Sequence, residues 1–138
     1  MKVIVSACLL GVDCKYDGGN NRCQRVLDFV KDHEVIPVCP EQMGGLSTPR
    51  PPAEIRDGKV INAEGVSVDE EFRRGAEAAL RLALDEGAEL AILQPRSPSC
   101  GCHQVYDGTF SRTLIPGRGI FAKMLADNGI EIREADEI

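Results

Sequence analysis

Residues 1–8 of the chain, MKVIVSAC, contain the first of the short apolar runs that predict the fold. Val3-Ile4-Val5 is a run of β-branched residues, which is typical of a strand buried on both faces of a sheet. A thiol, that of Cys8, follows this run at once. Short runs of the same kind recur along the chain, at residues 34–38, 88–94 and 130–133.

Helical spacing of apolar residues separates these runs. It is found at residues 21–32, 67–87 and 118–128. In the longest segment, Ser67 and Glu70 fit a capping box, which predicts that a helix begins there. A hairpin is expected at residues 54–62, where Asp57-Gly58 favours a tight turn. Strands that alternate with helices predict an α/β fold, one domain over residues 1–138 with three layers and a largely parallel β-sheet flanked by helices.

Composition and charge exclude several classes of protein. The chain has 138 residues, with 16 Lys and Arg against 22 Asp and Glu, and a net charge of -6. Binding to long nucleic acid is not expected, because such affinity comes largely from basic residues that neutralise phosphates. No apolar run approaches the ~20 residues of a membrane span, and the first one is too short for a signal peptide. We therefore expect a cytoplasmic protein with reduced thiols and no membrane partner.

Cysteine is the most informative residue type in this sequence. There are six, namely Cys8, Cys14, Cys23, Cys39, Cys100 and Cys102. In a reducing compartment, that number favours metal or catalytic chemistry over a set of disulfides. Cys8, Cys39 and Cys100 each follow a predicted strand. Because ligands bind beyond the carboxyl ends of parallel strands, we expect these three thiols to meet at one edge of the sheet.

Three convergent thiols fit more than one chemistry. Zinc takes four ligands in a structural site, or three and an open position in a catalytic one, and Cys102 could complete a set of four. An iron–sulfur cluster normally takes four Cys, so that three would leave one iron open to a substrate atom. Thiol redox chemistry through Cys100 and Cys102 is less favoured, because Cys-Gly-Cys lacks the Cys-x-x-Cys spacing. Simple burial of small apolar thiols is the remaining alternative.

Carboxylate and hydroxyl groups lie beside two of these cysteines. Glu41 comes two residues after Cys39, and Ser97 and Ser99 come shortly before Cys100. A carboxylate that moves protons and a hydroxyl that orients the reactants are what assisted attack by water requires. Ordinary turns and helix caps explain the same residue types equally well.

Three further polar residues are of the types that line functional sites. Asp17 lies in the sequence Asp17-Gly18-Gly19-Asn20, which is typical of a turn, and it is kept as a candidate substrate contact. His33 and His103 are the only histidines. Neither has a partner at a metal-ligand spacing, so a histidine-based zinc site is not expected.

Several segments of the chain together resemble the family of TudS-type thiouracil desulfurases, also called desulfidases. The resemblance covers nearly the whole sequence, and its motifs occur in the order of that family. They are Val5-Ser6-Ala7-Cys8-Leu9-Leu10-Gly11, Cys14-Lys15-Tyr16-Asp17-Gly18, Pro37-Val38-Cys39-Pro40-Glu41, Gly44-Gly45-Leu46, Pro49-Arg50, Ser97-Pro98-Ser99-Cys100-Gly101 and Tyr106-Asp107-Gly108-Thr109-Phe110-Ser111.

The resemblance implies an activity and a cofactor. It implies a [4Fe-4S] cluster held by Cys8, Cys39 and Cys100, with one open iron that binds the sulfur of a small thiolated base or nucleoside such as 2-thiouracil. Water would then replace that sulfur without net redox change and release sulfide. By the same resemblance, Glu41 is the acid/base carboxylate and Ser97 the catalytic serine, and Ser99 is placed beside them as a candidate substrate-binding residue.

Overall fold

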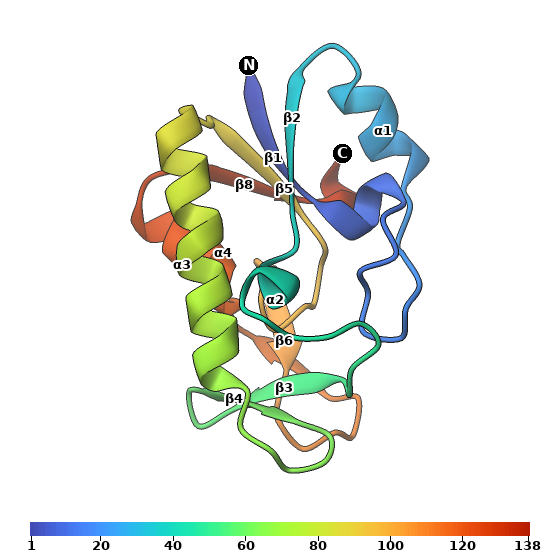
Figure 1. The fold of residues 1–138 in the computed structure, drawn as a ribbon, viewed down its shortest axis with the longest axis vertical. Helices are drawn as coiled ribbons and strands as arrows, with labels where there is room; N and C mark the ends of the chain where they lie inside the picture. The colour runs from blue at the N-terminus through green and yellow to red at the C-terminus, as the bar shows by residue number, and fades with distance from the viewer.

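A parallel sheet of four strands forms the centre of the protein (Figure 1), whose computed structural model describes residues 1–138. The strands are β1 (Lys2–Ser6), β2 (Glu34–Val38), β5 (Leu90–Leu93) and β8 (Glu131–Glu134). Their order is β2-β1-β5-β8, and every neighbouring pair is parallel. The predicted α/β fold with a largely parallel sheet is therefore confirmed.

Helices cover both faces of this sheet. On one face lie two helices, α3 (Asp69–Glu86) and α4 (Ile120–Asp127). On the other lie α1 (Gln24–Val30) and two short 3-10 helices, η1 (Ala7–Leu10) and η2 (Ala135–Glu137). The side chains of β1 alternate between the two cores: Ile4 packs with α3 and α4, whereas Val3 and Val5 pack with α1. This alternation explains why the centre of β1, Val3-Ile4-Val5, is apolar at every position.

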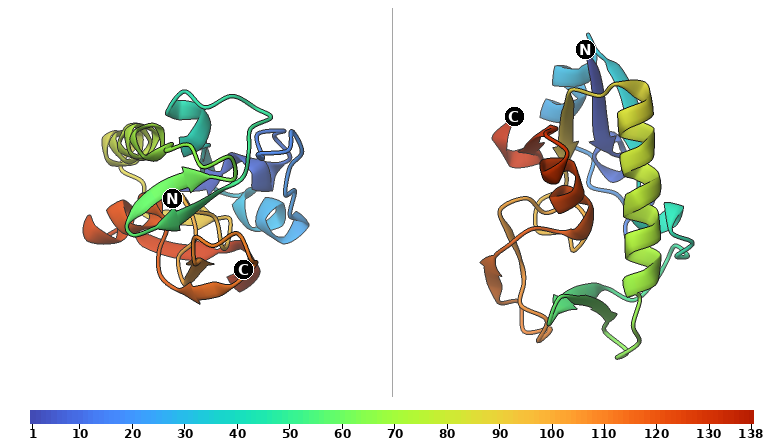
Figure 2. Two further views of the ribbon diagram at one scale, coloured as in Figure 1. Left: turned by 90° about the horizontal axis from the view of Figure 1, so that it is seen from below. Right: turned by 90° about the vertical axis from the view of Figure 1, so that its left-hand side faces the viewer.

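Two antiparallel hairpins lie beyond the carboxyl ends of the sheet, at the end of the molecule opposite the N-terminus (Figure 2). The first pairs β3 (Ala53–Arg56) with β4 (Lys59–Asn62), as predicted. The second pairs β6 (Gln104–Tyr106) with β7 (Leu114–Pro116) and was not predicted from the sequence. Its strands are only three residues long and largely exposed, so they carry no clear apolar alternation.

The longest helix begins differently from the prediction. Its N-cap is Val68, and no side chain caps it, so the capping box at Ser67 and Glu70 is wrong. The backbone of Val68 instead continues the pairing with β4, where its N–H donates to the Val60 carbonyl. The Asp69 carboxylate accepts the Val60 N–H in return, at 3.0 Å, so tertiary pairing with β4 determines where α3 begins.

The connections leave a crevice between two central strands. The chain leaves β1 toward α1 on one face of the sheet, and it leaves β5 toward α4 on the other face. At the carboxyl ends of β1 and β5, the two following loops therefore diverge to opposite faces of the sheet. Ligands of open α/β sheets bind in the crevice between such diverging loops. A short helix, α2 (Pro40–Met43), follows β2 at the same edge.

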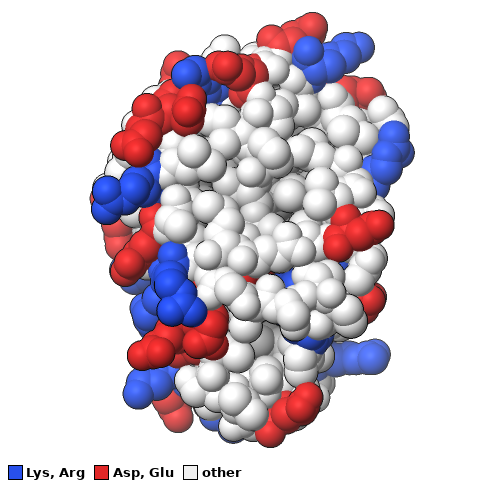
Figure 3. Space-filling model, in the orientation of Figure 1, with Lys and Arg blue, Asp and Glu red and all other residues white.

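Charged side chains lie mostly at the margins of the face seen in Figure 3, around a largely uncharged centre. Acidic and basic residues alternate along the edge that α3 occupies, and no continuous basic surface crosses this face. None of the helices combines the length and the apolar character needed to cross a bilayer.

Candidate active site

A cavity of about 710 Å³ opens at the carboxyl ends of β1, β2 and β5. The structure brings Cys8, Cys39 and Cys100 together in its wall, with Cys14 as a fourth cysteine. Residues of both hairpins, among them Glu54 and Tyr106, contribute to the opposite side. Cysteines that are more than 90 residues apart in the sequence thus share one chamber, because their strands are parallel neighbours.

Local structure explains the position of each of these three thiols. Cys8 lies in η1, directly after β1. This 3-10 helix ends at Gly11, whose φ of 95° is left-handed. Cys39 is the N-cap residue of α2, so its side chain stands at the start of that helix. Cys100 ends a tight turn after β5, in which Ser97 accepts hydrogen bonds from backbone amides. Local backbone structure therefore sets the position of each of the three thiols.

The environment of these thiols disfavours their free anions. Burial raises the pKa of Cys39 far above its usual value, and the negative charge of Glu41 adds to this effect. Burial likewise raises the pKa of Cys100, and that of Cys8, where an amide hydrogen bond from Asn21 at 3.5 Å opposes the rise. Desolvated thiolates require a positive partner, so the wall is suited to a cationic metal centre.

Glu41 lies next to the thiol of Cys39. The Cys39 Sγ is 3.3 Å from Glu41 Oε2, and the guanidinium of Arg50 approaches the same oxygen to 4.0 Å. Arg50 is held in turn by the Cys14 carbonyl, at 3.0 Å, and by the hydroxyl of Thr48, at 2.9 Å. A carboxylate, a thiol and a fixed guanidinium thus share one corner of the cavity.

Ser97 lines the cavity, whereas Ser99 does not. The Ser97 hydroxyl accepts the backbone N–H groups of Ser99, at 3.1 Å, and Cys100, at 3.0 Å. Because both interactions use oxygen lone pairs, its own proton remains available to donate. Ser99 is fully buried, and its hydroxyl has no hydrogen-bond partner. The expectation of a substrate contact through Ser99 therefore has no support in the geometry.

Asp17 also lies away from the cavity wall. It is exposed, and its carboxylate accepts the backbone N–H of Gly19, at 2.9 Å, in the turn that its sequence predicts. Cys102 and Cys23 are outside the cavity as well. Cys23 is the N-cap residue of α1, and the backbone N–H of Cys102 donates to Glu134. A four-cysteine set that includes Cys102 is not assembled here.

Two further residues at the site were not identified from the sequence. The Ser6 hydroxyl accepts the N–H of Gln94 at 3.1 Å, and Ser6 lines the cavity together with Cys100. Asn21 reaches back to Cys8 from the segment before α1. Ser6 ends a strand and Asn21 lies in a polar loop, so neither has a local signal that separates it from ordinary polar residues.

The spacing of the thiols indicates the size of the centre that they fit. One tetrahedral zinc ion would require sulfurs about 3.8 Å apart, since Zn–S bonds are about 2.3 Å. The only three Cys, His, Asp or Glu side chains with ligand atoms all within 4.8 Å of one another are His103, Glu134 and Glu137, outside the cavity. The cavity thiols are therefore spread more widely than a single ion needs. The fold and the site define a parallel α/β protein whose cysteine-lined cavity suits a multinuclear, thiolate-held centre.

Comparison with known proteins agrees with this description. The family profile of 2-thiouracil desulfurases matches residues 3–137. An uncharacterized protein, YbbK of Bacillus subtilis (strain 168), is 36% identical over 146 aligned positions that cover 99% of this chain and 97% of YbbK. The structure is also similar to that of a [4Fe-4S]-dependent thiouracil desulfidase, TudS, with a TM-score of 0.94, 41% identity, and coverage of 99% of this chain and 92% of that one. The chain belongs to the 2-thiouracil desulfurase family.

Proposed function

We propose that this protein is an iron–sulfur-dependent enzyme that converts the C=S group of a thiolated base or nucleoside, such as 2-thiouracil, to C=O. Water supplies the oxygen and hydrogen sulfide is released, so the reaction needs no oxidant or reductant. The observation that carries the proposal is the meeting of Cys8, Cys39 and Cys100 with Glu41 and Ser97 in one cavity. Family membership and the similarity to a [4Fe-4S]-dependent desulfidase support it.

Cys8, Cys39 and Cys100 are the proposed ligands of a [4Fe-4S] cluster. Their support lies in their position in the cavity wall, in a spacing wider than that of a single zinc site, and in the Asn21 amide that donates to the Cys8 sulfur. When bound through three thiolates, such a cluster supplies an open iron, a soft Lewis acid suited to the sulfur of a thiocarbonyl.

Glu41 is the proposed group that transfers protons. Its carboxylate oxygen is 3.3 Å from the Cys39 sulfur and faces the cavity, so it is placed to take a proton from an attacking water. The Arg50 guanidinium, 4.0 Å away, places a fixed positive charge beside this carboxyl group. The same carboxyl group then returns this proton to the leaving sulfur. The added hydroxyl loses its own proton as the C=O group forms, and this second proton also goes to the sulfur, so that one water is consumed and one hydrogen sulfide is formed.

Ser97 is the proposed hydroxyl that orients the reacting oxygen. Two backbone amides donate to its lone pairs, so its O–H is free to donate to a group inside the cavity that Ser97 lines. Donation to the oxygen that adds to the ring carbon stabilises the charge that develops there. Ser99 and Asp17 are left without a catalytic role.

The test begins with anaerobic purification. Iron and acid-labile sulfide are counted per chain, the visible spectrum is recorded, and 2-thiouracil is then assayed for release of uracil and sulfide. Near four irons and four sulfides with turnover are expected. Zinc without sulfide would instead make the protein a metal-binding module without this activity.

Matched variants separate the proposed roles. Cys8→Ser, Cys39→Ser and Cys100→Ser are expected to lose the cluster absorbance, whereas Cys23→Ser, outside the cavity, keeps it. Glu41→Gln is expected to keep the cluster and to lose turnover by two orders of magnitude or more, within the range of acid–base catalysis. Glu64→Gln serves as its control, since the Glu64 side chain is exposed and Glu64 is not among the residues that line the cavity. Full turnover by Glu41→Gln would remove Glu41 from the mechanism.

A further inference from the structure

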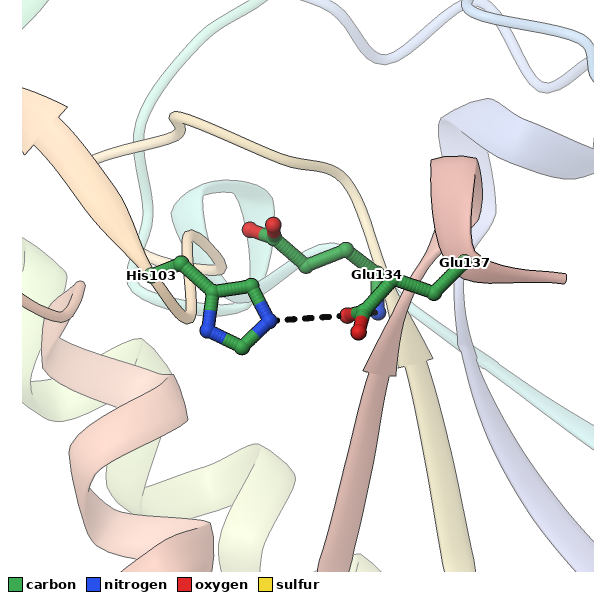
Figure 4. Close-up of side chains that lie close together, drawn as sticks. All are labelled: His103, Glu134 and Glu137. Atoms are coloured by element: carbon green, nitrogen blue, oxygen red, sulfur yellow. Dashed lines mark hydrogen bonds and ion pairs between the residues drawn. The ribbon is translucent and has the colours of Figure 1, made fainter.

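Three side chains outside the cysteine cavity offer a second set of metal ligands (Figure 4). His103 precedes β6, Glu134 ends β8 and Glu137 lies in η2. The imidazole and both carboxylates offer ligand atoms that all lie within 4.8 Å of one another. His103 Nε2 is 2.9 Å from Glu137 Oε1, and the Glu134 carboxylate lies beside the same ring.

Glu134 is the only charged residue that is buried in the whole protein, with 5% of its surface exposed. Its position at the carboxyl end of β8, next to β5, removes it from solvent. No Lys or Arg forms an ion pair with it. Burying a carboxylate without a Lys or Arg partner is costly, and a metal ion bound at this position would offset that cost.

Backbone groups hold both carboxylates in place. The Cys102 N–H donates to Glu134 Oε2 at 2.9 Å, and Glu134 and Glu137 form a reciprocal capping box at the start of η2. In that box the Glu134 N–H donates to Glu137 Oε1 at 2.8 Å. Ligands that are oriented before an ion arrives lose less entropy when they bind it.

We propose that His103, Glu134 and Glu137 bind one divalent first-row transition-metal ion, such as Mn²⁺ or Zn²⁺, separately from the cysteine cavity. Two carboxylates and a neutral imidazole carry two negative charges, which such an ion neutralises. One nitrogen and two oxygen donors are a ligand set that these ions accept and that soft, thiophilic ions do not prefer.

The spacing and the exposure of the three groups suit this ion. Ligand bonds of about 2.1 Å at tetrahedral angles place the donor atoms about 3.4 Å apart. The ligand atoms of the three side chains lie within 4.8 Å of one another, so small side-chain adjustments bring them to this distance. The side chains of His103 and Glu137 are 57% and 42% exposed, which leaves solvent-facing positions for water ligands and a path for the ion. The bound ion would connect the loop that carries Cys100 with the last strand and η2.

Manganese binding to the cluster-loaded protein tests the proposal. The protein is titrated anaerobically with MnCl2, bound Mn²⁺ is counted, and pulsed EPR measures coupling to a ligand nitrogen. One Mn²⁺ per chain with an imidazole coupling is expected. His103→Gln should weaken binding at least tenfold and abolish that coupling, whereas His33→Gln, a control at the other histidine, should change neither. Competition by ZnCl2, with MgCl2 as the weaker competitor, tests the class of ion.

Two results would overturn the proposal. If neither ion binds below the millimolar range, the three residues form only an ion pair and a helix cap. Binding that persists unchanged in His103→Gln, or that lacks a nitrogen coupling, would place the ion elsewhere. Glu137→Gln serves as a second variant, because Glu137 is exposed and the fold does not depend on its burial. It is expected to weaken Mn²⁺ binding at least tenfold while keeping the cluster absorbance.

Discussion

Gly75→Ala tests how closely α2 and α3 must approach to position the site. A Cβ built at Gly75 lies 2.7 Å from the Pro40 carbonyl carbon and 2.8 Å from the Gly44 nitrogen, and the Pro40 carbonyl oxygen is nearer still. These are backbone atoms of α2, so no side-chain rotation relieves the contact. Because Cys39 is the N-cap of α2, a displaced helix carries a proposed ligand with it.

The magnitude follows from these distances. Ordinary contact begins at 3.4 Å, so α2 must retreat by about 0.7 Å to free the carbonyl carbon, and by more to free the oxygen. Overpacking of this kind lowers the free energy of unfolding by about 3 kcal/mol, and the better helix propensity of Ala offsets about 1 kcal/mol of this loss. A net loss of about 2 kcal/mol lowers the Tm of a chain of this length by about 7 °C. A misplacement of about 1 Å costs turnover on the order of 100-fold.

Thermal unfolding, iron content and 2-thiouracil turnover of the Gly75→Ala protein provide the measurement. Arg81→Ala is the control, because Arg81 is an exposed residue of the same helix and its replacement is expected to change stability by less than about 0.5 kcal/mol. If Gly75→Ala raised the free energy of unfolding by about 1 kcal/mol and left turnover unchanged, helix propensity alone would explain it. The close approach of the two helices would then not control the site.

Three further predictions concern single interactions. Arg50→Lys should keep the cluster absorbance but lower 2-thiouracil turnover by about tenfold or more, because an ammonium cannot make the forked contacts that hold the guanidinium beside Glu41. Ser6→Ala should lower the free energy of unfolding by about 1 kcal/mol in denaturant titrations, because the Gln94 N–H loses its acceptor; an unchanged free energy of unfolding would contradict this. Asp69→Asn should cost about 1 kcal/mol at neutral pH in denaturant titrations. Burial raises the pKa of Asp69, but hydrogen bonds and a nearby guanidinium outweigh it and lower the pKa below that of the unfolded chain, so the difference from the parent protein should disappear as the pH falls through the folded-state value.

Local sequence patterns were sufficient to predict the elements of the sheet. Val3-Ile4-Val5 is apolar at every position because both faces of β1 are covered, and the runs that became β2, β5 and β8 were found in the same way. The convergence of Cys8, Cys39 and Cys100 also followed from the sequence, because parallel neighbouring strands end at the same edge. The apolar pattern and the positions of the cysteines together therefore located the edge of the sheet where the cavity lies.

Contacts between distant segments could not be predicted in this way. Ser67 and Glu70 have the spacing of a capping box, yet pairing of Val68 with β4 decides where α3 begins. Asp17 and Ser99 belong to segments next to the site, but which way a side chain points depends on the backbone path of each turn. Both side chains consequently lie away from the cavity.

The residues of the proposed second metal site are a further example of contacts that local sequence patterns do not predict. In the sequence, His103 has no partner at a ligand spacing, and the two glutamates lie more than 30 residues away near the end of the chain. Only the pairing of β8 with β5 brings Glu134 against the loop that holds Cys102 and His103. The sequence by itself determines which segments become strands and helices, since burial on one or two faces leaves a periodic pattern. The tertiary structure decides which polar side chains meet, because those meetings depend on strand order and loop path, which leave no such pattern.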